Sequence, residues 1–203
     1  CDRRIAMSLM RLPPVNPGGD GWAAFVGTCT HVGLAEMFMW ADAGSGRYST
    51  EERLTFPSEH VPGGTTDLID RQLWYVGDHK VMGTWSLDKL KSEGPSPGYR
   101  VQGHTYAMGA RLKGYPVEDV VIIGWPRERS SLDALYVWTE PYNPDLAREA
   151  IDRVDRIAAE VTESGGVIRK SPYDLPIDNS DCKFCKWHLP NGKSEGGACN
   201  GKR

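Results

Sequence analysis

Two stretches, Gly64-Thr65-Thr66-Asp67 and Gly77-Asp78-His79-Lys80, decide how we interpret this chain of 203 residues. Both lie in segments that are rich in β-branched and aromatic residues or alternate in polarity, as strands do. We predict strands over 65–70 and 73–81, joined as a hairpin through Asp70-Arg71-Gln72. Such a hairpin can bring Asp67 beside Asp78, and strand alternation puts Lys80 on the same face as Asp78.

Two carboxylates and a lysine in this arrangement have the chemistry of a metal-dependent hydrolytic site. Carboxylate oxygens are the ligands that Mg²⁺ or Mn²⁺ prefers. An ion held by Asp67 and Asp78 can stabilise charge on a phosphate and lower the pKa of a bound water. Lys80 would orient that water or stabilise the transition state. The alternative is an ordinary salt-bridged Asp-x-Lys strand, since this short sequence is common by chance.

Three residues on predicted helices could complete such a site. His31 lies in a helix predicted over 22–43 and could supply a neutral imidazole ligand, although a helical histidine is more often structural. Gln102 and Tyr106 lie one turn apart in a helix predicted over 101–112, so they share a helix face. Both could hydrogen-bond a phosphate, and Tyr106 could stack on a base. The alternative is a polar–aromatic pair packed over the sheet.

The remaining patterns complete an α/β chain. Asn143-Pro144-Asp145 is a strong helix start, with Asn143 as N-cap. A mixed central sheet flanked by helices is the natural packing for this order of elements. The other predicted segments are helices over 1–12, 86–91 and 146–161, strands over 53–56, 117–125 and 134–138, and a loop over 94–98.

Composition and charge exclude some classes of protein. Hydrophobic residues make up 39% of the chain and charged residues 25%, which is typical of a globular protein. No apolar run approaches the length of a membrane span, and no secretory signal is visible. The odd number of cysteines fits a compartment that keeps thiols reduced better than disulfides, so we expect a cytoplasmic protein. A net charge of −3 argues against general coating of polyanions. A local DNA-binding groove that includes Arg100 and Arg111 remains compatible with that charge, and the alternative is solvated surface arginines.

The five cysteines indicate a metal or cluster site better than a disulfide scaffold. Cys182-Lys183-Phe184-Cys185 is a C-x-x-C pair, and Cys199 follows it. Cys1 could add a fourth thiolate, which suits an iron–sulfur cluster. A structural Zn²⁺ bound by the three C-terminal cysteines and either Cys1 or His188 is the alternative. We expect Cys29 to be a small, buried, inert thiol.

The motifs, taken in order, resemble a known nuclease family. A Gly-Thr-x-x-His helix, Gly-x-x-Asp, Asp-x-Lys and Gln-x-x-x-Tyr are similar to the RecB-like branch of the PD-(D/E)xK nuclease superfamily. The resemblance implies a restriction-endonuclease-like core in which His31, Asp67, Asp78 and the backbone carbonyl of His79 bind Mg²⁺ or Mn²⁺. It further implies that Lys80 is catalytic and that Gln102 and Tyr106 contribute to catalysis and DNA binding.

The cysteines extend this resemblance. One N-terminal and three C-terminal cysteines resemble the iron–sulfur staple of the CRISPR-associated and AddB-type exonucleases. The resemblance implies a [4Fe–4S] cluster held by Cys1, Cys182, Cys185 and Cys199, which ties the C-terminal segment to the first helix. It also implies one nuclease domain over 1–203, with a core at about 22–164 and a staple formed by Cys1 and 167–203.

The expected function is therefore that of a Mg²⁺- or Mn²⁺-dependent DNA exonuclease. Its substrate would be single-stranded DNA or DNA ends, in recombination, repair or phage DNA metabolism. Its expected partners are DNA and either further copies of itself or a recombination protein, and no membrane. If the chain comes from a phage, the location would be the host cytoplasm. The alternative is a catalytically silent DNA-end-binding or partner subunit with a structural zinc or iron–sulfur site.

Overall fold

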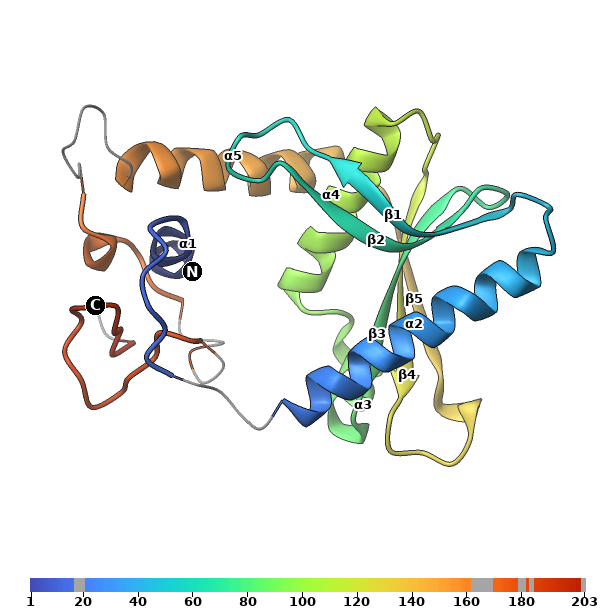
Figure 1. Ribbon diagram of the computed structural model, residues 1–203, viewed down its shortest axis with the longest axis horizontal. Coiled ribbons are helices and arrows are strands. Elements are labelled where there is room, and N and C mark those ends of the chain that lie inside the picture. The colour runs from blue at the N-terminus through green and yellow to red at the C-terminus, as the bar shows by residue number, and fades with distance from the viewer. Residues whose placement is uncertain (17–20, 162–169, 179–181, 183–184, 202–203) are drawn as a thin grey trace. The chain divides into compact units, whose positions relative to one another are not determined.

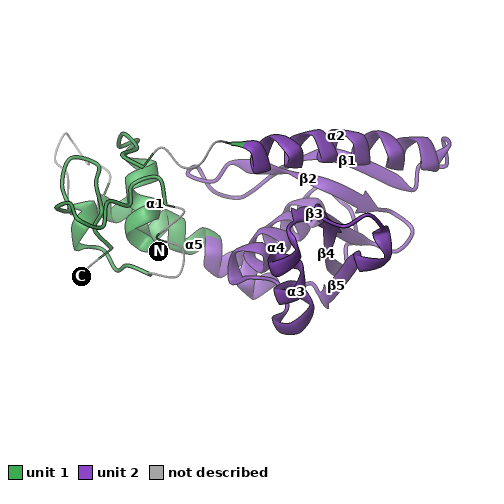
Figure 2. Ribbon diagram, turned by 90° about the horizontal axis from the view of Figure 1, so that it is seen from below, with its two compact units in different colours: residues 1–21, 151–203 green, residues 22–150 purple. Residues whose placement is uncertain are grey.

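The computed structural model describes residues 1–16, 21–161, 170–178, 182 and 185–201. They belong to two units, one formed by 22–150 and the other by 1–21 together with 151–203 (Figure 2). The predicted end of the core at 164 and the predicted start of the staple at 167 lie outside the described residues.

A five-stranded sheet forms the centre of the unit 22–150 (Figure 1). Neighbouring strands are antiparallel except β3 and β4, which run parallel. The predicted mixed α/β architecture is therefore confirmed. The strands, in their order across the sheet, are β1 (Tyr48–Thr55), β2 (Gly63–Asp70), β3 (Tyr75–Met82), β4 (Asp119–Pro126) and β5 (Tyr136–Pro141).

Helices cover both faces of this sheet (Figures 1 and 2). Helix α2 (Trp22–Asp42) packs on one face against β1, β2 and β3. Helices α3 (Thr84–Glu93) and α4 (Pro97–Leu112) lie on the other face and form the crossover that a parallel β3–β4 pair requires. Gly103 allows the close approach of α4, because a Cβ there would lie 2.4 Å from Val120 Cγ1.

Two elements, β1 and α4, begin four or more residues before their predicted starts. Strand β1 begins at Tyr48, five residues before the predicted start at 53, because pairing with β2 along its whole length outweighs its polar sequence. Helix α4 begins at Pro97, inside the predicted loop, because the Ser96 side chain accepts a hydrogen bond from the Tyr99 amide. The predicted N-cap of α5 (Pro144–Val161) is confirmed, since Asn143 Oδ1 accepts hydrogen bonds from the next helical amides.

The unit formed by 1–21 and 151–203 joins the two ends of the described chain. Helix α1 (Asp2–Leu9), shorter than the predicted 1–12, buries Ala6 and Met7. The indole of Trp187, which is almost fully buried, donates a hydrogen bond to the Leu12 carbonyl. Met7, Trp187 and Cys199 belong to one apolar cluster. The N-terminal helix and the C-terminal segment therefore share a core.

Membrane-spanning helices were sought in the described part of the chain, and none combines the length and apolar character that crossing a bilayer requires.

Candidate metal centre

The predicted hairpin is present and brings the two carboxylates together. The antiparallel pairing of β2 and β3 ends at Leu68 and Gly77, and Asp67 and Asp78 are the next residues along the two strands. Asp67 Oδ2 accepts a hydrogen bond of 2.6 Å from the His79 amide. Burial acts to raise the pKa of Asp67, but His31 and this amide outweigh it and hold that pKa below its usual value. Asp67 is therefore an anion fixed at the hairpin.

Asp78 and Lys80 form an ion pair on one face of β3. Lys80 Nζ lies 2.5 Å from Asp78 Oδ2, as strand alternation predicts for residues two positions apart. Asp78 is only 2% exposed, and this burial raises its pKa to about 6, although the lysine opposes the shift. The pair thus consists of a desolvated carboxylate and a cation that is already held at the site.

A hydrogen-bonded chain continues from Lys80 to α4. Lys80 Nζ donates to Gln102 Oε1 at 3.1 Å, and Gln102 Nε2 donates to the Tyr106 hydroxyl at 3.0 Å. The shared helix face predicted for Gln102 and Tyr106 is therefore present. Gly64 on β2 makes room for the ring, because a Cβ there would lie 2.7 Å from Tyr106 Cε1. Helix α4 thereby fixes one side of the lysine.

Helix α2 contributes His31 from the other face of the sheet. His31 Nδ1 lies 3.3 Å from Asp67 Oδ1, and the hydrogen bond with this carboxylate raises the pKa of the imidazole. The predicted histidine and Asp67 therefore come from two elements and lie within the reach of one cation, whereas Asp78 of β3 is not part of the group of ligand atoms that all lie within 4.8 Å of one another. A histidine beside ionised Asp67 can serve as a neutral ligand once a cation replaces its proton.

The His79 side chain lies within a cluster of rings. It stacks on Phe38 with 5.6 Å between ring centroids, and its Nδ1 accepts a hydrogen bond of 3.2 Å from the Trp125 indole. Burial lowers the pKa of His79 to about 4, so the ring is neutral at pH 7. This packing holds β3 in place at His79, the residue that follows Asp78.

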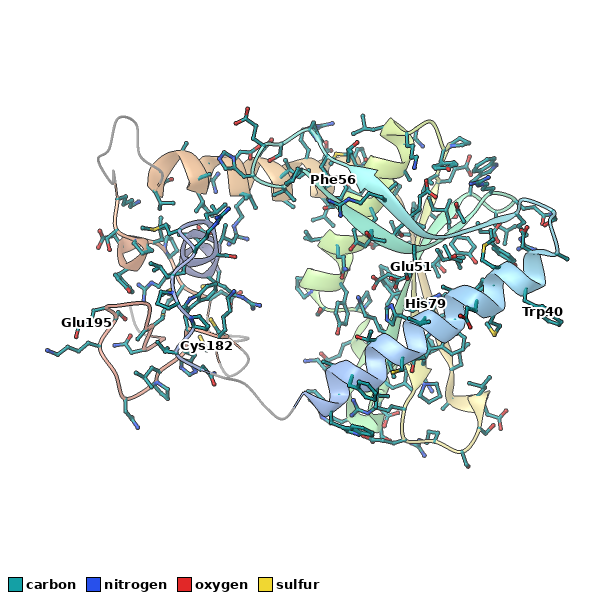
Figure 3. The ribbon with its side chains drawn as sticks, viewed as in Figure 1. Trp40, Glu51, Phe56, His79, Cys182 and Glu195 are labelled. Atoms are coloured by element: carbon teal, nitrogen blue, oxygen red, sulfur yellow. The ribbon has the colours of Figure 1, made fainter. Side chains whose placement is uncertain are left out.

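Glu51 on β1 is a candidate ligand that sequence reasoning missed. The register Thr50–Leu68 and Glu52–Thr66 puts Glu51 across from Asp67, and the ligand atoms of His31, Glu51 and Asp67 lie within 4.8 Å of one another. Figure 3 shows Glu51 and His79 next to α2. Burial and the nearby Asp67 charge raise the pKa of Glu51.

No local signal marks Glu51, because only the register of β1 against β2 brings it to Asp67. Its backbone has a left-handed φ of +52°, which is uncommon for a residue other than glycine. Glu51 and His31 also line a groove of about 630 Å³ along α2, together with Ala24, Gly27 and Glu36.

The two arginines predicted to bind DNA make contacts within the chain. Arg100 forms a two-pronged ion pair with Glu140, with distances of 2.9 and 2.8 Å. Arg111 donates to the Val117 carbonyl at 2.6 Å and lies over the Tyr142 ring. The Arg100 side chain nevertheless remains exposed. DNA binding by Arg100 or Arg111 stays a prediction.

The four cysteines predicted to bind a cluster converge in the unit formed by 1–21 and 151–203. Cys1, Cys182, Cys185 and Cys199 line one cavity of about 70 Å³, and His188 lies on the same cavity. Four thiolates suit an iron–sulfur cluster, and three thiolates with a histidine suit zinc. Cys29, in contrast, is exposed on α2, so the prediction that it is buried was wrong. Cys29 lies on the side of α2 that faces solvent.

Comparison with solved structures gives a likeness at the level of the fold. An alkaline exonuclease from Laribacter hongkongensis superposes with a TM-score of 0.50 at 14% identity, covering 77% of this chain and 74% of that one. This chain has a restriction-endonuclease-like nuclease fold. The structure of SSO0001 superposes with a TM-score of 0.48 at 18% identity, covering 92% of this chain and 79% of that one. The sequence matches no protein-family model and no curated protein.

Proposed function

We propose that this protein is a metal-dependent deoxyribonuclease that degrades single-stranded DNA or DNA from its ends. The observation that carries the proposal is the convergence of His31, Asp67, Asp78 and Lys80 from three elements of a nuclease-like fold. A purely structural ion pair would need neither the histidine nor the second carboxylate. Recombination, repair or phage DNA metabolism is the proposed setting.

The donor chemistry of these residues suits a divalent cation, and His31 and Asp67 lie close enough to share one. His31, Asp67, Asp78 and the His79 carbonyl would hold Mg²⁺ or Mn²⁺, because hard oxygen ligands with one imidazole suit these ions. When bound, the ion would neutralise charge on the scissile phosphate and acidify a water. The desolvated Asp78 carboxylate, raised in pKa, is the type of group that such a cation stabilises in its ionised form.

Lys80 is the proposed catalytic cation of the chain itself. Its ammonium group is held between Asp78 and Gln102, and these two contacts fix the position of its N–H donors at the hairpin. From there it can orient the attacking water by a hydrogen bond and stabilise the extra negative charge of the transition state. Gln102 and Tyr106 position the lysine and can contact the DNA backbone.

Metal removal is the first test of the proposal. We expect end-labelled single-stranded DNA to be degraded in Mn²⁺ or Mg²⁺, left intact in EDTA, and degraded again when excess Mn²⁺ is restored. A circular single strand serves as the matched substrate, because an exonuclease needs an end. Cleavage that persists in EDTA would contradict the metal requirement, and cleavage of the circle would replace the exonuclease proposal by an endonuclease.

Glu51 is proposed as an additional ligand of the same cation. Oxygen ligands lie about 2.0–2.6 Å from Mg²⁺ or Ca²⁺, so the ligand atoms of one ion are at most about 5 Å apart. Glu51, His31 and Asp67 meet this limit. We expect Glu51→Gln to weaken Mn²⁺ binding about 10-fold in calorimetric titration.

Glu36→Gln is the matched control for this prediction, because Glu36 lines the same groove outside the three-residue cluster. The control should bind Mn²⁺ as the parent does. Equal affinity of the parent and Glu51→Gln would remove Glu51 from the proposed ligand set.

A [4Fe–4S] cluster held by Cys1, Cys182, Cys185 and Cys199 is the proposed second cofactor. The support is the meeting of four thiol groups on one cavity of about 70 Å³. The zinc alternative, which would use His188 or Cys1, predicts a colourless protein that contains zinc and no acid-labile sulfide. The RecB-like family membership, a homo-oligomer or recombination partner, and a cytoplasmic location stay predictions.

A further inference from the structure

Arg3 is a charged side chain inside the unit that carries the cysteines. It lies on α1 two residues after Cys1 and is only 4% exposed. Arginine is rarely buried to this degree unless its charge and donors serve a specific partner. Its neighbour Arg4 lines the same cavity but is exposed. The two residues therefore form a natural pair for comparison.

The guanidinium of Arg3 joins a backbone segment to a cysteine sulfur. Its Nη2 donates to the carbonyls of Tyr173 at 2.6 Å and Leu175 at 3.4 Å. Its Nη1 donates to Cys199 Sγ at 3.4 Å, and both partners of this contact are buried. The carbonyls fix the plane of the guanidinium, so the donor that faces the sulfur is held in place.

We infer that Arg3 is a positioning residue that orients Cys199 and sets the reduction potential of the cluster at this site. The inference rests on the proposed iron–sulfur cluster. A hydrogen bond to a ligand sulfur withdraws electron density from it, and a buried positive charge favours the state with one more electron. Both effects stabilise the reduced cluster and raise its potential. Arg3 does this without being a ligand itself.

The test is a redox titration of the anaerobically purified protein, followed by the visible absorption of the cluster. We expect Arg3→Gln to lower the midpoint potential so that the reduced-to-oxidised ratio at a fixed potential falls about 10-fold, which corresponds to about 59 mV for one electron. Arg3→Lys keeps the charge and should fall between Arg3→Gln and the parent. Arg4→Gln removes the same charge from an exposed position on the cavity, where water screens it, and should shift the potential by much less than Arg3→Gln.

Each outcome decides the inference. If Arg3→Gln loses its cluster during purification, the titration of Arg3→Lys gives the measurement. Unchanged potentials in the Arg3 variants at full iron content would overturn the inference, and so would an equal shift in Arg4→Gln. Zinc in place of iron in the parent would overturn both the cluster and this inference. Mn²⁺-dependent DNA cleavage, measured on the same samples, shows separately whether the proposed nuclease activity holds.

Discussion

Lys80→Ala is expected to lower the rate of DNA cleavage by at least about 100-fold. The lysine contacts Asp78 and Gln102 at the hairpin, where a fixed cation can stabilise the charge that develops on the phosphate. The rate of nucleotide release from end-labelled DNA, at saturating Mn²⁺, is the measurement. The variant should fold, because Asp78, with a pKa raised to about 6, can take up a proton when it loses its partner.

Lys91→Ala is the matched control for Lys80→Ala, because Lys91 is an exposed lysine in the last turn of α3. The control should cleave DNA at the rate of the parent. If Lys80→Ala kept more than a third of the parent rate while circular dichroism showed an unchanged fold, Lys80 would lose its catalytic role.

Cys185→Ala is expected to cost more stability than Lys80→Ala or Glu51→Gln. It removes one of four thiol groups on the shared cavity, and binding energy at such a site is folding energy. A loss of about 3 kcal/mol would lower the melting temperature by roughly 6–12 °C for a chain of this size. The measurement is calorimetric or optical melting of the anaerobically purified protein, beside its iron content.

Cys29→Ala is the control for the cysteine prediction, because Cys29 is exposed on α2 and lies outside that cavity. It should melt with the parent. The cluster is expected to act on stability before chemistry, so Cys185→Ala should still cleave DNA at low temperature. An unchanged melting temperature in Cys185→Ala would show that the thiol has no structural role.

Much of the candidate centre could be predicted because its signals are local. The period of two along a strand placed Asp78 and Lys80 on one face, and the four-residue spacing on a helix placed Gln102 beside Tyr106. The hairpin was predictable because two strand-like segments are separated by a short polar turn. These features depend only on residues close to one another in the sequence.

The features that the sequence did not reveal depend on contacts between distant segments. Glu51 reaches Asp67 through the pairing of β1 with β2. The first half of β1 is polar, so its sequence gives no strand signal there. The burial of Arg3 depends on carbonyls near residue 173, which no pattern on α1 indicates. Arg100 pairs with Glu140 across the fold, and nothing around Arg100 indicates that partner.

The central claim is that the Asp67–Asp78–Lys80 hairpin is a metal-dependent nuclease centre. One gel tests it most directly: the parent and Lys80→Ala, each incubated with the same end-labelled single-stranded DNA in Mn²⁺. We predict a ladder or mononucleotide products in the parent lane and intact DNA in the variant lane. Intact DNA in both lanes, from samples with full cofactor content, would contradict the claim and favour a DNA-binding role without catalysis. Equal degradation in both lanes would place any nuclease activity outside this hairpin.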